Sequence, residues 1–318
     1  MSTYDSILLI AFGGPEKPAD VRPFLANVVR GRPVPPERLD VVAHHYEIMG
    51  GRSPLNERTF EQAAALRLRL RDEGPDLPVY VGMRNWTPYL KETLDRMRSD
   101  GCRRAIGFIL SAQQSEAGWE RYQRNVAEAR AAVGAAAPAV DFTGGWALHP
   151  LFIEAAAARV TEALAQLPAA TRSAARLIFT AHSIPTAMAA RSPYVAQVTE
   201  GGRLVAERVR MPRWQIAFQS RSGNPREPWL EPDINDALRG AAAEGARTII
   251  VAPIGFVCDH VEVLYDLDVE ARQTAADLGL DFVRAPAMND HPIFIRMMAD
   301  VIRCFFHQDA QAGAHAGD

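Results

Sequence analysis

Short apolar runs alternate with longer amphipathic stretches along most of the chain. Runs rich in β-branched residues predict buried strands, and apolar residues that recur with helical spacing predict helices packed on a core. The predicted strands are residues 7–12, 79–83, 105–110, 177–181, 214–219 and 248–254. The clearest predicted helices are residues 60–71, 88–98, 150–166 and 292–306. Strands that alternate with helices indicate an α/β fold in which helices cover both faces of a parallel sheet.

Several motifs of the first half recur in the second half. DGCR and EGAR each directly precede a predicted strand, one in each half. IAFGGPE is paired in the same way with IFTAHSIP, since each motif is a strand followed by a polar loop. We therefore expect a duplicated chain with two similar α/β domains, residues 1–145 and 146–307. The last helix, 292–306, is expected to pack back on the first domain, and the polar tail, 308–318, to be disordered.

Composition limits the classes of protein to which the chain can belong. Apolar residues make up 48% of it and charged residues 23%, as in soluble globular proteins. The net charge of -3 provides no basic field for nucleic acid, and no apolar run is long enough to span a membrane. The N-terminus lacks the pattern of a signal peptide, so we expect a cytoplasmic protein. Cys102, Cys258 and Cys304 are far apart, which excludes a CxxC zinc site and fits a reduced compartment.

Two polar loops that follow predicted strands carry ionisable residues. TAHSIP contains His182, and PIGFVCDHVEVLYD contains Glu262. In open α/β sheets ligands bind at the carboxyl ends of the strands, which is where both loops lie. An imidazole titrates near neutral pH and can abstract a proton, so His182 opposite a carboxylate would be reasonable catalytic geometry. The alternative is that His182 is a hydrogen-bonded core residue.

An acidic row begins in the second loop. Glu262, Asp266 and Glu270 recur at every fourth position, so on a helix they would share one face and repel unless they share a cation or a proton. The alternative is a solvated acidic face. Because Val261 and Val263 on either side of Glu262 look buried, we favour a row that faces a cleft and passes a divalent cation inward or protons outward.

These motifs together resemble the ferrochelatase family. The matching segments are FTAHSIP, PIGFVCDHVEVLYDLDVEA, FQSRSGNPREPWLEPDI, VVRGR and YEIMGGRSPLNERT, and the resemblance covers residues 7–302. It implies the chelatase fold, in which two Rossmann-like domains with parallel sheets flanked by helices surround a porphyrin cleft. It also implies an enzyme that inserts ferrous iron into a porphyrin in heme biosynthesis.

The resemblance implies roles for individual residues. His182 would accept pyrrole protons or bind the entering metal, and Glu262 would face it across the macrocycle. Asp266 and Glu270 would continue the metal-binding polar path to the surface. The porphyrin-binding residues of the opposite wall would be Phe12, Arg30, Arg52, Ser53 and Tyr122. Arg52 is included because a guanidinium can hold a carboxylate bidentately.

The substrate is expected to be coproporphyrin III. VVRGR, FGGPE and QSRSG resemble the monomeric branch of the family that uses this porphyrin, and protoporphyrin IX is the alternative. Ferrous iron would be a substrate, with no permanent cofactor, and the lack of a C-terminal cysteine cluster predicts no iron–sulfur centre. Two other functions stay open: a cobalt chelatase, and a tetrapyrrole or metal carrier without catalysis. The sequence also leaves open whether His182 or Glu262 takes the protons.

Overall fold

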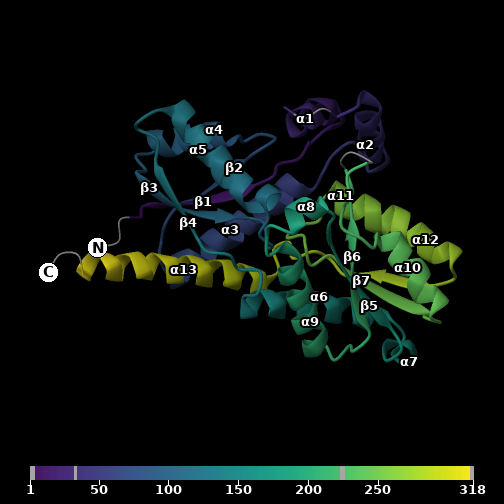
Figure 1. The fold of residues 1–318 in the computed structure, drawn as a ribbon. Helices are drawn as coiled ribbons and strands as arrows, with labels where there is room; N and C mark the ends of the chain where they lie inside the picture. Colours follow the sequence, from purple (N-terminus) through teal and green to yellow (C-terminus); the bar gives the residue numbers. More distant parts are fainter. Residues whose placement is uncertain (1–3, 32–33, 223–225, 316–318) are drawn as a thin grey trace.

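Two parallel four-stranded sheets form the framework of the computed structural model, which describes residues 4–31, 34–222 and 226–315 (Figure 1). The first sheet has the order β2 (Val79–Met83), β1 (Ser6–Ala11), β3 (Arg104–Ile109), β4 (Ala139–Phe142). The second has the order β6 (Trp214–Gln219), β5 (Arg176–His182), β7 (Thr248–Ala252), β8 (Asp281–Arg284). Both sheets therefore follow one strand order, which agrees with the recurring motifs of the two halves.

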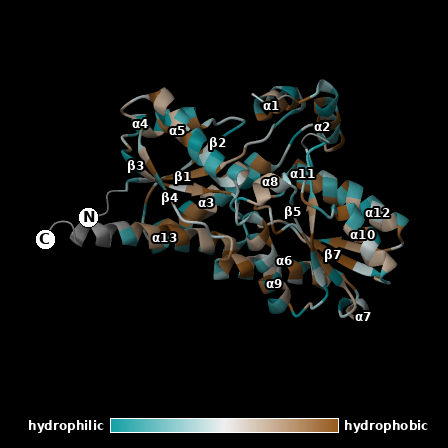
Figure 2. Ribbon diagram, viewed as in Figure 1, coloured by the Kyte–Doolittle hydropathy of each residue, from teal (hydrophilic) through white to brown (hydrophobic). Residues whose placement is uncertain are grey.

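Helices cover both faces of each sheet, as the continuous apolar strands require. In the first sheet, Leu9 packs in a core with α3 (Leu55–Glu73), and Leu8 packs on the other face with α4 (Leu90–Ser99) and α5 (Arg121–Val133). Successive strand residues point to opposite faces, so an uninterrupted apolar run fills both cores. Figure 2 shows the resulting hydrophobic strands between helices whose outer faces are hydrophilic.

The second sheet is covered in the same way. Phe179 packs with α6 (Pro150–Gln166) and α9 (Tyr194–Arg208), whereas Ile178 packs with α10 (Ile234–Ala243) on the opposite face. The other helices are α1 (Val21–Val28), α2 (Pro36–Ile48), α7 (Ala169–Arg172), α8 (Thr186–Ala189), α11 (Val261–Val263), α12 (Arg272–Asp277), the 3-10 helix η1 (Pro18–Asp20) and the π-helices η2 (Glu116–Glu120) and η3 (Leu264–Ala271). No helix in the described part of the chain is long and apolar enough to cross a membrane.

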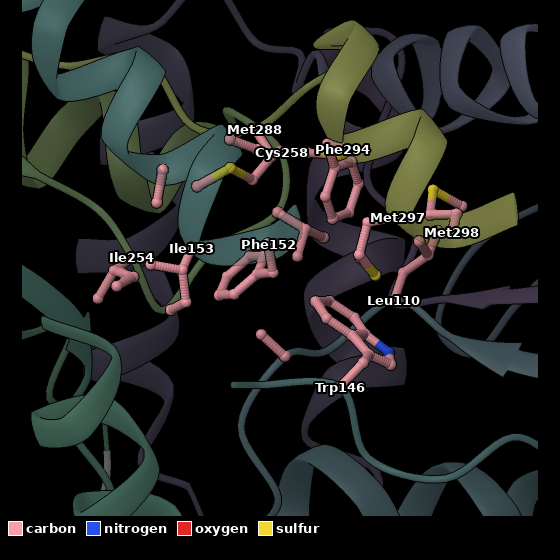
Figure 3. Close-up of a cluster of buried hydrophobic side chains, with 14 of the residues drawn as sticks. Leu110, Trp146, Phe152, Ile153, Ile254, Cys258, Met288, Phe294, Met297 and Met298 are labelled. Carbon is pink, nitrogen blue, oxygen red and sulfur yellow. The ribbon is translucent and has the colours of Figure 1, made fainter. Parts of the chain in front are cut away.

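One apolar core joins the two halves. The final helix, α13 (Pro292–His315), packs on α3 of the first half and on α6 of the second. Trp146 lies at the centre of this core, with its ring centroid 5.3 Å from that of Phe152 and 5.9 Å from that of Phe294 (Figure 3). The Trp146 ring also stacks on Phe108 of β3, so side chains from both halves form one continuous core.

The structure corrects the expected ends of several elements. The six predicted strands are present, but β4 and β8 were not predicted, because each is a short edge strand whose residues are half-exposed or exposed. The helix expected at 292–306 continues to His315, and this contradicts the expectation of a disordered tail from residue 308. Alanine is the best helix former, which accounts for the continuation through this Ala-rich stretch. Residues 316–318 lie outside the described part of the chain.

Candidate active site

His182 is the last residue of β5, which lies between β6 and β7 in the second sheet. Its position at the carboxyl end of an inner strand is where ligands bind in open α/β sheets. The Nδ1 atom of the ring is hydrogen-bonded to the carbonyl oxygen of Ser183. Because a carbonyl can only accept, we assign a proton to Nδ1, so that in the neutral tautomer the lone pair is on Nε2. The backbone carbonyl of His182 is fixed by the Tyr194 hydroxyl, which donates to it over 2.9 Å.

Glu262 faces the free nitrogen of this ring. The Glu262 Oε2 atom lies 3.7 Å from His182 Nε2, and the two side chains are 43% and 31% exposed. Both groups are therefore accessible from solvent while they face each other. Glu262 lies in α11, immediately after the loop that leaves β7. The structure thus brings together the two residues that the sequence placed at the centre of the site.

A glycine allows these two segments to approach closely. The loop after β7 passes over β5 at Gly255, whose amide donates to the carbonyl of Thr180 over 3.0 Å. A Cβ atom added to Gly255 would lie 2.5 Å from the Cβ of Ala181, closer than packed atoms can approach. Only glycine fits here, and the approach sets the separation between His182 and Glu262.

The acidic row continues along the π-helix η3. Asp266 is the most buried of the three acids, whereas Glu262 is half-exposed and Glu270 is exposed. The Ser220 hydroxyl and the Gln219 side-chain amide both donate to Asp266 Oδ2. Burial, together with the nearby Glu262 and Glu270 carboxylates, raises the pKa of Asp266 to about 8, against the opposing effect of the two hydrogen bonds. Asp266 therefore keeps its proton near neutral pH, between two acids that solvent can reach.

Opposing effects act on the pKa of the outer acid, Glu270. Burial and the Asp233 carboxylate raise the pKa of Glu270, and the Arg38 guanidinium acts in the opposite direction. Arg38 belongs to α2, which lies above α11 in the view of Figure 1. Helix α2 thus places a positive charge at the outer end of the row.

Two of the predicted porphyrin-binding residues converge on an arginine that was not predicted. The Arg84 guanidinium lies 5.6 Å from the ring centroid of Phe12 and 4.6 Å from that of Tyr122. Its Nε atom donates to the side-chain oxygen of Asn125 over 2.7 Å. Phe12 is half-buried, and Tyr122 is buried against the helices of the first sheet. Tyr122 thus lies beneath Arg84, and its contact with the porphyrin stays a prediction.

The other three predicted residues contact partners other than Arg84, and Ser53 lies against the loop that follows Phe12. Arg30 is exposed and donates to the side-chain oxygen of Asn27. Arg52 is exposed, with a guanidinium nitrogen 3.9 Å from a Glu57 carboxylate oxygen. Ser53 is buried, and its amide donates to the carbonyl of Pro15 over 2.8 Å. Its position beneath the loop that follows β1 makes it part of the support of that loop.

An apolar cluster links the first half to the segment that carries Glu262. Phe12 and Phe24 pack edge to face in this cluster, which also includes Tyr46 and Val261. Burial raises the pKa of Tyr46, and the Glu262 carboxylate raises it further, so the phenol stays protonated beside that acid. The residue next to Glu262 is therefore packed directly against the first half.

A second contact between the halves is a stacked ring pair. The rings of His45 in α2 and Tyr265 in η3 lie 3.8 Å apart and within 13° of parallel. Sequence reasoning treated His45 as an ordinary helix residue and did not single out Tyr46, Arg84, Gln219 or Ser220. The motif FQSRSG was a visible signal for Gln219 and Ser220, because it follows a predicted strand of the same sheet as His182.

The facing side chains of His182 and Glu262 offer two ligands to a cation. Within the described ranges, no three His, Cys, Asp or Glu side chains come together as a metal-binding group. The His182–Glu262 pair offers one nitrogen and one carboxylate, which suit a divalent ion of the first transition series. A pair with so few ligands fits a metal that passes through the site as a substrate. The pair can also accept a proton, at the Nε2 atom of His182.

Comparison with known proteins identifies the family of this site. A sequence model described as Ferrochelatase matches residues 4–304. A coproporphyrin III ferrochelatase of Mycolicibacterium smegmatis is 44% identical over 308 residues, which cover 96% of this chain and 91% of that protein. One of Streptomyces griseus is 45% identical over 317 residues, covering 94% of this chain and 84% of that protein. A ferrochelatase of Rhodopirellula baltica is 44% identical over 301 residues, which cover 94% of this chain and 86% of that protein.

Solved structures show a similar fold. SirB from Bacillus subtilis with Fe3+ has a TM-score of 0.62 at 10% identity, and the match covers 95% of each chain. The sirohydrochlorin chelatase SirB in complex with cobalt has a TM-score of 0.57 at 10% identity, covering 95% of this chain and 94% of that one. At this level of identity the match supports the two-sheet chelatase fold and carries no information about the metal or the substrate.

Proposed function

The chain belongs to the ferrochelatase family, and we propose that it inserts ferrous iron into coproporphyrin III to form coproheme. Its relatives at 44% to 45% identity that are named coproporphyrin III ferrochelatases support this choice of porphyrin over protoporphyrin IX. Coproporphyrin III also carries more propionates than protoporphyrin IX. Exposed guanidiniums such as those of Arg30 and Arg52 suit such a substrate, because they can hold carboxylates bidentately.

The observation that carries this proposal is the His182–Glu262 pair. Insertion exchanges two pyrrole protons for one Fe2+ ion, so the site must accept protons at the centre of the macrocycle. The free Nε2 atom of His182 is a suitable acceptor, because Nδ1 holds its own proton against the Ser183 carbonyl. The Glu262 carboxylate, 3.7 Å away, stabilises the imidazolium that forms.

The acidic row then carries protons away from the His182–Glu262 pair and iron toward it. Glu262, Asp266 and Glu270 lead from the pair to the exposed surface, and Asp266 is the buried step between them. An acid whose pKa is about 8 can release and recover a proton near neutral pH. The same oxygens can hold a divalent cation, which would displace that proton. We therefore propose one path for inward iron and outward protons.

The first half supplies the opposite wall. We propose that Phe12 and Arg84 present an apolar ring and a charge to the porphyrin, with Tyr122 and Ser53 supporting them from beneath. Phe12 has no hydroxyl, so it cannot provide a phenolate ligand to iron. The wall therefore shapes and orients the macrocycle, and the chemistry lies with His182 and Glu262.

We further propose that the protein is a cytoplasmic monomer with no permanent cofactor and no iron–sulfur centre. Iron is then a substrate that leaves with the product. Anaerobic incubation with coproporphyrin III and either ferrous iron or cobaltous ion, followed by absorbance, tests the function. Faster metallation by iron is expected. Metallation by cobalt alone would indicate a cobalt chelatase, and porphyrin binding without metallation by either ion would indicate a carrier.

A further inference from the structure

The last residue of β8, Arg284, joins two carboxylates that lie on either side of Glu262 in the chain. The Arg284 Nη1 atom lies 2.8 Å from Asp259 Oδ1, and its Nε atom lies 2.9 Å and 3.0 Å from the two oxygens of Asp268. Asp259 comes three residues before Glu262, and Asp268 comes six residues after it. The Arg284 guanidinium therefore holds the chain at two points on either side of Glu262, one at the end of the loop and one within η3. We call Arg284, Asp259 and Asp268 the Arg284 bracket.

The three groups of this bracket are shielded from water. The side chains of Arg284, Asp259 and Asp268 are 12%, 14% and 27% exposed. Burying an ion pair costs desolvation energy that the attraction often fails to repay, so such a pair is weak evidence for added stability. Its better-attested effect is to specify one arrangement among several. The question is then which arrangement this pair specifies.

Asp259 is also fixed from a second side. The Asn289 side chain donates to Asp259 Oδ2 over 2.7 Å and accepts from the Asp259 amide over 2.9 Å. The Asn289 amide donates to the carbonyl of Val257 over 2.9 Å. Asn289 has a φ of 46°, in the left-handed region that asparagine tolerates better than most residues. Both oxygens of Asp259 are thus held, and the end of the loop cannot shift without breaking several bonds.

The segment inside the bracket has a conformation that needs support. Residues Leu264–Ala271 form a π-helix, whose i to i+5 hydrogen bonds make it rare compared with the α-helix. If this segment tightened to an α-helix, the chain between Asp259 and Asp268 would change its register. Asp266 would then turn away from Ser220, and the row would lose its alignment with Glu262. Arg284 fixes the chain before this stretch, at Asp259, and the middle of the π-helix, at Asp268.

We propose that Arg284 is a positioning residue that holds Glu262 and Asp266 in register opposite His182, so that the metal is taken up along the acidic row. This inference rests on the proposed chelatase function. Arg284 acts through Asp259 and Asp268, and it contacts neither porphyrin nor metal. The porphyrin wall lies in the first half, around Phe12, so release of the bracket affects the metal side of the reaction.

The test compares steady-state metallation by wild type, Arg284→Met, Arg284→Lys and Arg272→Met, with iron and porphyrin varied separately. Arg272 is the matched control, because its guanidinium also lies near Asp268, at 3.4 Å, but it is half-exposed and does not reach Asp259. We expect Arg284→Met to raise the KM for ferrous iron by about tenfold to a hundredfold, with the KM for porphyrin unchanged. Arg284→Lys should recover part of this loss, and Arg272→Met should behave as wild type.

A purely structural role predicts a different pattern. Partial unfolding would lower the maximal rate in proportion to the folded fraction and leave both KM values unchanged, so an unchanged iron KM in Arg284→Met would overturn the proposal. If that variant does not fold, Asp268→Asn removes one arm of the bracket and should raise the iron KM alone. An unchanged iron KM in Asp268→Asn would then overturn it. A wild-type protein that metallates no porphyrin would instead refute the proposed function.

Discussion

Gly255 lies against Ala181 so closely that a Cβ atom on the glycine would stand 2.5 Å from the alanine Cβ. The contact joins the strand that ends at His182 to the loop that leads to Glu262. The distance between the two proposed catalytic side chains therefore depends on a glycine that carries no chemistry itself.

Gly255→Ala should separate the two segments and misplace Glu262. We expect a loss of stability of about 1–3 kcal/mol from overpacking, and a fall in kcat of about tenfold to a hundredfold. The measurements are urea unfolding and steady-state metallation. Gly240→Ala is the matched control, since a Cβ there meets no heavy atom within 4 Å and Gly240 lies in helix α10. It should stabilise the protein by about 0.5–1 kcal/mol. Normal turnover in Gly255→Ala would contradict the role of the close approach.

Asp266→Asn should change how stability depends on pH. The pKa of Asp266 is raised from 3.8 in the unfolded chain to about 8 in the folded chain. Between these values the folded state binds more protons, so the Asp266 contribution lowers stability as pH rises through that window. An asparagine at this position does not ionise, so it does not lower the stability as the pH rises. The melting temperature of the variant minus that of wild type should therefore increase from pH 5 to pH 8, by a few degrees.

The control for this measurement is Asp236→Asn, which changes an exposed acid on α10. Its melting temperature relative to wild type should stay nearly constant over the same range. If Asp266→Asn behaved in the same way, the carboxyl group would not be protonated in the folded chain at neutral pH.

Arg84→Met should weaken the wall of the first half. The substitution removes the cation–π contacts with Phe12 and Tyr122 and the hydrogen bond to Asn125. We expect a loss of about 1–2 kcal/mol in the free energy of unfolding, measured with urea. Arg84→Lys keeps the charge without the planar guanidinium, so its free energy of unfolding should lie between those of wild type and Arg84→Met. Equal stability of all three proteins would show that the contacts carry no net energy.

Arg30→Met tests the proposed anion partners. An exposed guanidinium that holds a propionate should be needed for porphyrin binding and not for the chemical step. We expect the KM for coproporphyrin III to rise by roughly tenfold with kcat within about twofold of wild type. Arg239→Met, which changes an exposed arginine of α10, is the control. A porphyrin KM equal in both variants would remove Arg30 from the site.

Local sequence patterns predicted the elements that build the site. His182 and Glu262 each follow a run that is buried on both faces, and such runs form parallel strands whose carboxyl ends meet at one edge of the sheet. The meeting of the two residues therefore followed from topology. The acidic row was predicted from its four-residue spacing, although that spacing cannot distinguish an α-helix from the π-helix that forms.

Other features depend on contacts that no local pattern records. Strand β8 was not predicted because it is short and half-exposed, so the bracket formed by its last residue, Arg284, was hidden as well. The burial of Tyr122 beneath Arg84 was likewise not predicted, because it depends on how α5 turns toward the first sheet. The direction of a helix face is set by its tertiary partners, and Arg84 belongs to a segment far away in the sequence.

The most direct measurement of the central claim is anaerobic insertion of ferrous iron by wild type and His182→Ala, followed by absorbance. Coproporphyrin III and protoporphyrin IX are tested side by side, and porphyrin binding is measured separately by fluorescence quenching. The account predicts fast metallation of coproporphyrin III by wild type, slower metallation of protoporphyrin IX, and loss of both in His182→Ala with porphyrin binding retained. Normal turnover by His182→Ala would contradict the role of the His182–Glu262 pair.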